Sequence, residues 1–303
     1  MPSATVQPPL KIGRRSVPLS NPQKVLYPDA GFTKADVVHY YLEVAPYLLP
    51  HLADRPLTLK RYPNGVAGPF FYEKMCPTHR PAWVSTARMK TTNRQIDFCV
   101  IDDAAALAWV ANLASLELHT LLSKSPDLDR PTFMVFDHDP GPGADLLDCI
   151  RVAKRFRELL KHLGLESFPK TSGGKGLHLY VPLNTAVTFD DTKLFSHTVA
   201  QILEKQDPTH VTTNMSKALR HNKVFVDWSQ NDRHKTTACA YSLRARSRPT
   251  VSTPVEWDEL DRALRKDDPD LLTFETAGVL KRVKKKGDVF ADVLRLKQKL
   301  PSP

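Results

Sequence analysis

Three aspartates in this sequence follow apolar segments in a pattern that suits the binding of divalent metal ions. Asp137 and Asp139 end the segment FMVFDHD, and Asp227 ends the segment KVFVD. Because side chains alternate along a strand, Asp137 and Asp139 lie on the same face. Two carboxylates this close repel each other unless a cation lies between them. Hard cations such as Mg²⁺ and Mn²⁺ prefer carboxylate oxygens, so the three aspartates are candidate ligands of two catalytic ions.

A glycine-rich segment, TSGGKGLHLY at residues 171–180, supplies groups that bind phosphate. Its glycines let backbone N–H groups approach an oxyanion, and Ser172, Lys175 and His178 add a hydroxyl, a cation and an imidazole. The segment matches neither of the common nucleotide patterns GxxxxGK[ST] and GxGxxG. A nucleotide triphosphate lying between this loop and the metals would allow phosphoryl chemistry by positioning and charge neutralisation.

Two other enzyme classes place a D-x-D motif after an apolar strand. Phosphatases of the haloacid dehalogenase type use the first aspartate as a nucleophile, but usually have Thr or Val where this chain has Gly141. Many glycosyltransferases use the motif to hold a sugar nucleotide through a metal. Gly141 disfavours the phosphatase class, and the basic composition and the glycine-rich loop disfavour the glycosyltransferase class.

The elements that position these residues can be predicted from periodicity. Strands are expected over residues 132–136 and 177–182 and up to Asp227, with helices over 146–163 and 191–206. This β-α-β-β-α-β order suits a ferredoxin-like or RNA-recognition-like sheet. Upstream, Thr33 and Asp36 predict the N-cap of a helix. A further strand is followed by a predicted buried helix from about Asp103 to His119.

Composition predicts a basic protein with a polyanionic partner, because 303 residues carry a net charge of +10. No apolar run approaches the roughly 20 residues of a membrane span. The four cysteines are scattered, so neither a disulfide framework nor a four-cysteine zinc site is expected. We therefore expect a protein of the reducing cytoplasm.

The domain organisation is expected to be simple. Residues 1–20 contain four prolines and are predicted to form a flexible arm. Residues 21–303 are predicted to form one catalytic domain. It would have an N-terminal part over about 21–130, a motif-bearing part over about 131–260 and a C-terminal helical segment over about 256–303.

The segments FDHDPG, TSGGKGLHLYVPL and KVFVDWSQN…KTTACAYSLRAR resemble the three motifs of the archaeo-eukaryotic primase superfamily. The sequence is most similar to the polymerase domain of bacterial ligase D and its stand-alone relatives, the non-homologous end-joining polymerases. The resemblance extends from about residue 21 to about residue 257. It implies an α/β primase-polymerase fold in which an RNA-recognition-like central sheet and an N-terminal α/β subdomain form a cleft. It also implies template-directed nucleotidyl transfer with two Mn²⁺ or Mg²⁺ ions and a preference for ribonucleotides over deoxyribonucleotides.

The same resemblance implies roles for individual residues. Asp137, Asp139 and Asp227 would bind the metals, and Asp227 would also orient the primer 3′-hydroxyl. The incoming nucleotide would be bound by Lys60, His119, Ser172, Gly173, Lys175, His178, Arg244 and Arg246, with His119 near the sugar. The 5′-phosphate of the downstream strand and the template would be bound by Asn21, Lys24, Lys34, Phe70, Phe71 and Arg220. Lys34 lies at the predicted start of a helix, which attracts anions.

The biological role implied by the resemblance is gap filling at double-strand breaks, by a nucleoid-associated protein in the cytoplasm of a prokaryote. The substrates would be DNA with gaps or 3′ overhangs bearing a 5′-phosphate, and Ku and a DNA ligase would be partners. A monomer is possible, with two copies bridging a pair of ends. The chain lacks a KxDG adenylation motif, so it is either a stand-alone enzyme or an excised domain. A de novo primase and a non-catalytic DNA-end-bridging module are the alternatives; the second would not depend on Asp137.

Overall fold

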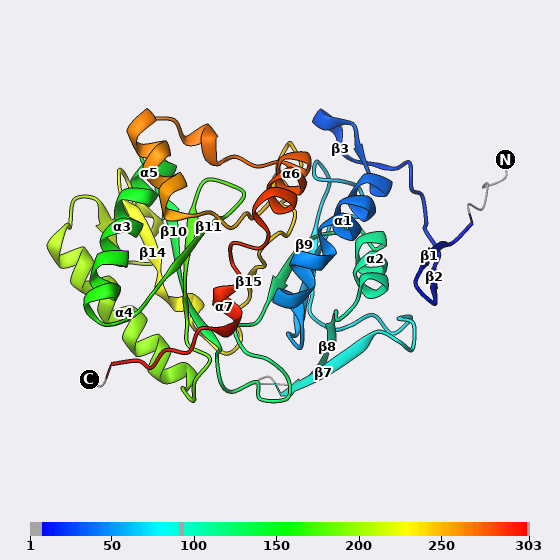
Figure 1. Cartoon of the computed structure of the whole chain (residues 1–303), viewed down its shortest axis with the longest axis horizontal. Helices are drawn as coiled ribbons and strands as arrows, with labels where there is room; N and C mark the ends of the chain where they lie inside the picture. The colour runs from blue at the N-terminus through cyan, green and yellow to red at the C-terminus, as the bar shows by residue number, and fades with distance from the viewer. Residues whose placement is uncertain (1–7, 91–93, 302–303) are drawn as a thin grey trace.

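The computed structural model describes residues 8–90 and 94–301 as a mixed α/β structure built on two main sheets (Figure 1). The five-stranded sheet has the order β11–β12–β10–β14–β13, and only β13 and β14 are parallel. Its strands are β10 (Phe133–Pro140), β11 (Phe168–Thr171), β12 (Leu177–Pro182), β13 (Val211–Thr212) and β14 (Val224–Asp227). The predicted strand over residues 177–182 and the strand ending at Asp227 are confirmed.

Two helices cover one face of this sheet, as the periodicity predicted. They are α3 (Leu146–His162) and α4 (Phe189–Gln206), and each begins with a capping box. Met134 and Phe136 of β10 pack with α3 in one apolar cluster. Phe133 and Val135 belong to a second cluster with the N-terminal half of the chain. The face of β10 that includes Asp137 is therefore directed toward the N-terminal sheet.

The N-terminal sheet has six strands in the order β15–β9–β5–β8–β7, with β6 paired to β5. They are β5 (Leu57–Arg61), β6 (Phe71–Glu73), β7 (Ser85–Lys90), β8 (Gln95–Val100), β9 (Ser115–Thr120) and β15 (Thr237–Ala238). The helix α1 (Lys34–Leu52) packs with α2 (Ala104–Asn112) in the same apolar cluster as β5 and β9. The predicted N-cap is confirmed, because Thr33 and Asp36 form a capping box at the start of α1.

The helix predicted from about Asp103 to His119 is wrong in its second half. The helix α2 ends at Asn112, and residues 115–120 form β9, which pairs with β5 and β15. Ala114 breaks the helix by adopting a left-handed conformation with a φ of 57°. The segment is apolar almost throughout, so helical and strand periodicity could not be distinguished.

Two further expectations are corrected near the N-terminus. Residues 1–7 of the predicted flexible arm lie outside the described residues, but Leu10–Ile12 (β1) pairs with Arg15–Val17 (β2), and the Val17 side chain is buried. A short β3–β4 hairpin (Val25–Tyr27 and Phe32–Thr33) follows.

Cys76 and Cys99 form a disulfide, although no disulfide framework was expected. The two cysteines are 23 residues apart, and this spacing does not indicate that they meet. In the structure the chain after β6 lies against β8, where the Cys76 N–H donates to the Asp97 carbonyl.

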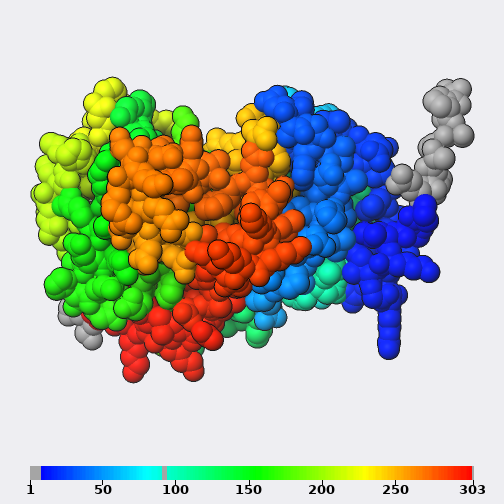
Figure 2. Space-filling view, turned by 45° about the horizontal axis from the view of Figure 1, so that its top comes forward, coloured from blue at the N-terminus to red at the C-terminus, as the bar shows by residue number. Residues whose placement is uncertain are grey.

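The C-terminal segment, with α5 (Trp257–Lys266), α6 (Thr276–Lys286) and α7 (Asp292–Arg295), lies across both halves of the molecule (Figure 2). Asp288 accepts a hydrogen bond of 2.6 Å from the Tyr241 hydroxyl and pairs with His51 of α1 at 2.8 Å. Gln298 hydrogen-bonds to the Pro182 carbonyl at the end of β12. These contacts attach the segment to both sheets. Within the described ranges, none of the helices has the length and apolar character that crossing a membrane requires.

Asn231 continues the sheet beside β10 at the point where β14 ends. Its side-chain oxygen accepts from the Val135 N–H at 2.9 Å, and its amide donates to the Val135 carbonyl at 2.8 Å. Val135 is two residues before Asp137, so this fully buried amide supports the backbone that positions the aspartates.

We predict that Asn231→Ala lowers the free energy of unfolding by about 3 kcal/mol, because two buried backbone groups lose their partner. Chemical denaturation monitored by circular dichroism measures this loss. Asn214→Ala is the matched control, because Asn214 is exposed and its side chain, among the described residues, bonds only to the Ser216 N–H of its own turn; its effect should stay within about 0.5 kcal/mol. An Asn231→Ala loss as small as that of the control would contradict the prediction.

Candidate active site

One lateral row of the five-stranded sheet contains a lysine, a histidine and two aspartates. Lys170 of β11 lies opposite His178 of β12, and His178 lies opposite Asp137 of β10. Asp137 in turn lies opposite Asp227 of β14. Asp139 lies two residues farther along β10 on the same face. The strand β10 continues to Pro140, so both aspartates lie within it. The predicted end of this strand at residue 136, before the aspartates, is wrong. The register thus brings all three carboxylates together.

Asp137 lies in a strongly desolvated, negatively charged environment. Its Oδ1 atom is 3.3 Å from the His178 Nε2 atom, and this buried oxygen has no hydrogen-bond donor among the described residues. Burial, and then the charges of Asp139 and Asp227, raise the pKa of Asp137 well above its usual value. Burial and Asp227 also raise the pKa of Asp139, an effect that the charge of Arg220 opposes. The site therefore holds excess negative charge.

Asp227 is held by its own turn. Its carboxylate accepts hydrogen bonds from the Ser229 N–H at 2.9 Å, from the Ser229 hydroxyl at 2.5 Å and from the Gln230 amide at 3.0 Å. In the part of the chain that the structure describes, no three Asp, Glu, His or Cys side chains already form an arrangement that could hold a metal ion.

The donor set nevertheless fits a divalent cation. A bound cation would give the buried Asp137 oxygen the partner that it lacks among the described residues. It would also relieve the repulsion between Asp137 and Asp139. Carboxylate oxygens are the ligands that Mg²⁺ and Mn²⁺ prefer. The aspartates therefore remain the candidate metal ligands.

The glycine-rich loop lies beside this row and is fixed by internal hydrogen bonds. The Ser172 hydroxyl accepts from the N–H groups of Gly174 and Gly176, each at 3.1 Å. Gly173 has a φ of 69°, and an added Cβ would lie 2.7 Å from the Val251 backbone, so a side chain is excluded there. The exposed Lys175 makes no ion pair within the described residues, which leaves its ammonium available to an anion.

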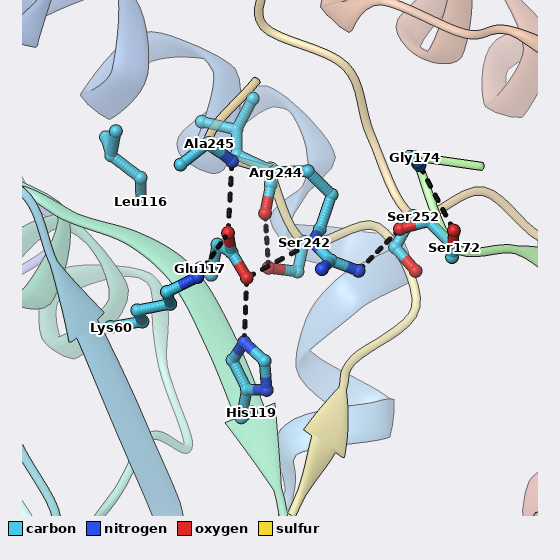
Figure 3. Close-up of polar contacts among 12 residues, drawn as sticks. Lys60, Leu116, Glu117, His119, Ser172, Gly174, Ser242, Arg244, Ala245 and Ser252 are labelled. Carbon is cyan, nitrogen blue, oxygen red and sulfur yellow. Dashed lines mark hydrogen bonds and ion pairs between the residues drawn. The ribbon is translucent and has the colours of Figure 1, made fainter. Parts of the chain in front are cut away.

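A buried glutamate that the sequence analysis missed organises the predicted nucleotide-binding cations (Figure 3). The Glu117 carboxylate of β9 contacts the Lys60 ammonium at 3.3 Å, the His119 Nε2 atom at 2.9 Å and the Arg244 Nε atom at 3.1 Å. The Ala245 N–H also donates to it at 3.1 Å. Burial alone would raise the pKa of Glu117, but the His119 hydrogen bond and the neighbouring cations hold it well below its usual value. The only sequence signal was an acidic residue in an apolar segment.

Residues from both sheets line one pocket of about 430 Å³. It includes Asp137, His119, His178 and Arg244, so four of the predicted site residues meet there. Arg244 connects the pocket to the glycine-rich loop, because its guanidinium donates to the Ser172 carbonyl at 2.6 Å. The exposed Arg246 lies close to the same loop, next to Gly174. Two lysines that the sequence analysis did not consider, Lys74 and Lys235, also line the pocket.

A second cationic site lies at the start of α1. The Lys34 N–H donates to the Lys24 carbonyl at 2.9 Å, and the Lys24 N–H donates to the Asn21 carbonyl at 3.0 Å. The structure therefore brings together the three residues predicted to bind a 5′-phosphate. Burial, and then the charge of Lys24, lower the pKa of Lys34. An anion at this helix N-terminus would relieve that repulsion.

The remaining predicted residues are two exposed aromatic rings, Phe70 and Phe71, and the partly buried Arg220. Phe70 and Phe71 are 50% and 43% exposed, so they are not core residues. The Lys60 ammonium lies 4.4 Å from the centre of the Phe70 ring, which connects this surface to Glu117. The Arg220 guanidinium lies 3.5 Å above the Phe225 ring, on the strand beside Asp139.

Comparison with known proteins gives consistent matches. A model of the family described as LigD, primase-polymerase domain, matches residues 33–290. The multifunctional non-homologous end joining protein LigD of Mycolicibacterium smegmatis is 43% identical over 277 residues, which cover 91% of this chain and 36% of that protein. The corresponding DNA repair protein LigD of Mycobacterium tuberculosis strain H37Rv is 44% identical over 281 residues, covering 90% and 36%. The chain therefore spans little more than a third of these relatives.

A solved structure, the polymerase domain from Mycobacterium tuberculosis ligase D in complex with DNA, matches with a TM-score of 0.86 and 42% sequence identity. The match covers 93% of this chain and 99% of that one. It confirms the expected mixed α/β primase-polymerase fold, and the relatives confirm the expected family and enzyme class. The chain belongs to the LigD primase-polymerase domain family, a family of nucleotidyltransferases whose catalysis depends on metal ions.

Proposed function

We propose that this chain extends primers and fills short gaps at double-strand breaks in non-homologous end joining, by template-directed nucleotidyl transfer with a preference for ribonucleotides. The carrying observation is the row from Lys170 to Asp227, which together with Asp139 brings three carboxylates beside a glycine-rich loop, next to a pocket lined from both sheets. That the relative in the solved complex binds DNA supports the proposal.

In this proposal the primer 3′-hydroxyl attacks the α-phosphate of a nucleoside triphosphate and pyrophosphate leaves. Asp137, Asp139 and Asp227 would hold two Mn²⁺ or Mg²⁺ ions, which activate the attacking hydroxyl and stabilise the leaving oxygen. Asp227 would orient the 3′-hydroxyl. The triphosphate would be held by residues of the loop and of the strands beside it: Ser172, Gly173, Lys175, His178, Arg244 and Arg246. Lys60 would lie near the nucleotide, and His119 near its sugar.

The DNA would be held on both sides of the break. Asn21, Lys24 and Lys34 would bind the 5′-phosphate of the downstream strand, since Lys34 is buried at a helix N-terminus and a phosphate would offset its charge. The exposed rings of Phe70 and Phe71 would stack on template bases. Arg220 would act in end synapsis, in which two copies bridge two ends. Ku and a DNA ligase are the partners we propose, in the cytoplasm of a bacterium.

We predict that the chain extends a primer across a one-nucleotide gap with Mn²⁺ or Mg²⁺, more efficiently with ribonucleotides than with deoxyribonucleotides. Asp137→Ala should reduce kcat/KM by about a thousandfold or more, because a principal source of transition-state stabilisation is lost. A 5′-phosphate on the downstream strand should stimulate extension, and Lys34→Ala should reduce that stimulation about tenfold. Gel-based primer extension measures all four effects.

Lys161→Ala is the matched control for the Lys34 variant, because Lys161 is exposed on α3, behind the sheet. Equal extension with and without the 5′-phosphate would contradict the proposed role of Asn21, Lys24 and Lys34 in gap recognition. Synthesis without any primer would identify a de novo primase. Tight end binding without any nucleotide transfer would favour a bridging module.

A second prediction concerns stability without metal. Because the pKa of Asp137 and of Asp139 is raised in the folded state, that state binds protons that the unfolded chain has released. The free energy of unfolding should therefore fall as the pH rises from mildly acidic to neutral. Asp137→Asn should reduce this fall and stabilise the metal-free protein at neutral pH by about 1–2 kcal/mol. Urea unfolding in the presence of a chelator measures both effects.

The same experiment includes metal and control arms. Mn²⁺ should raise the unfolding midpoint of the wild type more than that of Asp137→Asn, because binding to the folded state stabilises it. Asp127→Asn is the matched control, since Asp127 forms an exposed ion pair with Arg130 and should have little effect. Equal stabilisation by Mn²⁺ in wild type and Asp137→Asn would exclude Asp137 as a metal ligand.

A further inference from the structure

The strand β6 and the residue after it lie between the candidate active-site pocket and a neighbouring pocket. Tyr72 and Lys74 line the active-site pocket of about 430 Å³. The same two residues also line a pocket of about 580 Å³, together with Phe71, Met75 and Cys76. We call this larger space the β6 pocket. Because Tyr72 and Lys74 face both spaces, β6 and Lys74 form a wall that the two pockets share.

The shared wall is attached to one edge of β5. The other edge of β5 pairs with β9, so β8 and β6 occupy successive parts of the same edge. Cys99 of β8 lies opposite Leu57, and Glu73 of β6 lies opposite Leu59. An ion pair of 2.9 Å between Glu73 and Arg61 adds to the β6 ladder. Among the described residues β6 has no second partner strand, and such short edge strands are weakly held.

The Cys76–Cys99 disulfide fixes the chain just after the shared wall. The Cα atoms of the two cysteines are 4.8 Å apart, and the Cys76 N–H donates to the Asp97 carbonyl of β8 at 2.7 Å. The rings of Phe71 and Tyr72 are exposed, so burial in the core does not hold them in place. Their position therefore depends on the contacts of β6 with β5 and on the disulfide.

The two sulfurs of this disulfide differ in access. Cys76 lines the β6 pocket, whereas Cys99 lies within β8 and is only 1% exposed. A thiolate that enters the β6 pocket would therefore attack the Cys76 sulfur. The S–S bond breaks, and Cys99 leaves as a thiolate that takes up a proton from water. A second thiol then displaces the mixed disulfide, so that Cys76 becomes a thiol and the two reductant sulfurs become a disulfide.

We propose that Cys76–Cys99 is a thiol–disulfide exchange site, which a small thiol reaches through the β6 pocket, and that its reduction releases the shared wall. Disulfides of cytoplasmic proteins are usually catalytic or redox-sensing, and the cytoplasm is the compartment of the proposed function. In the reduced protein Phe71 and Tyr72 would have to be ordered again whenever a template binds. This effect on template binding rests on the proposed function; the exchange reaction and the release of the wall do not.

Counting thiols in the full chain tests the exchange site. After equilibration with oxidised glutathione, alkylation in denaturant should label only the two free cysteines, Cys149 and Cys239. Dithiothreitol added to the native protein should make Cys76 and Cys99 available for labelling as well. Labelling of all four after oxidised glutathione would overturn the proposal. So would a disulfide that dithiothreitol reduces only after the protein has been denatured.

Hydrogen exchange measures the release of the wall without nucleotide or metal. Peptides over residues 71–80 should exchange about tenfold faster in the reduced protein, because local opening is no longer limited by the cross-link. Peptides of α4 serve as the internal control and should not change. Equal exchange of residues 71–80 in the oxidised and the reduced wild type would overturn the proposed release.

Variants separate the disulfide from other effects of the redox buffer. The double variant with Cys76→Ser and Cys99→Ser should exchange at the reduced rate in both buffers. Cys149→Ala is the matched control, because this free and fully buried cysteine lies on α3, behind the other sheet. It should keep the response of the wild type. If either variant fails to fold, the comparison of the oxidised and reduced wild type still decides.

Template binding gives the functional readout. Fluorescence anisotropy with a labelled single-stranded oligodeoxynucleotide should give a Kd about tenfold higher for the reduced wild type, because two freed rings must be ordered on binding. The double variant should show the higher Kd in both buffers. An equal Kd in both redox states of the wild type would overturn the effect on template binding. If the wild type transfers no nucleotide in either state, the proposed function fails, while the thiol counts and hydrogen exchange still decide this inference.

Discussion

Repulsion between three carboxylates on one face of a sheet is the constraint on which the rest of the site depends. The register places Asp227 directly opposite Asp137, and the alternation of β10 adds Asp139 to the same face. Folding alone does not relieve this repulsion, as the raised pKa of Asp137 shows. The surrounding structure supplies rigid support instead. The antiparallel ladder to β12 and the buried Asn231 amide fix the backbone of β10 on both sides.

Glu117 produces the opposite effect on the far side of the pocket. One buried carboxylate draws Lys60 from β5, His119 from β9 and Arg244 from the chain after β15 into a single cluster. A buried acid with several cationic partners is retained because removing it would leave those cations unpaired. Arg244 also donates to the Ser172 carbonyl, so the cluster connects the N-terminal sheet to the loop of the other sheet. Charged residues therefore flank the pocket on both sides.

The sequence was sufficient for features that depend on local pattern. The apolar strands, the amphipathic α3 and the capping box at Thr33 follow from periodicity and short-range hydrogen bonding, and all are present. Features that depend on contacts distant in sequence were missed or mistaken. The segment around Glu117 was predicted to be helical because it is apolar almost throughout. The role of Glu117 in a strand beside the pocket could therefore not be inferred. The Cys76–Cys99 disulfide depends on how β8 and the chain after β6 meet in space.

Several charged groups of the site share one property, which is that burial disfavours their charge. Burial raises the pKa of Asp137 and lowers that of Lys34, and it lowers that of Lys170 to about 7. A protein selected for stability alone would have replaced such groups by apolar ones. The site keeps buried carboxylates and buried lysines, so both signs of charge are disfavoured there. This indicates ligands of both signs, cations for the carboxylates and anions for the lysines. Under the proposed function, divalent cations would meet the carboxylates, and the phosphates of a nucleotide and of a DNA end would meet the lysines. A nucleotidyltransferase acting at a broken strand is a protein that binds all of these at once.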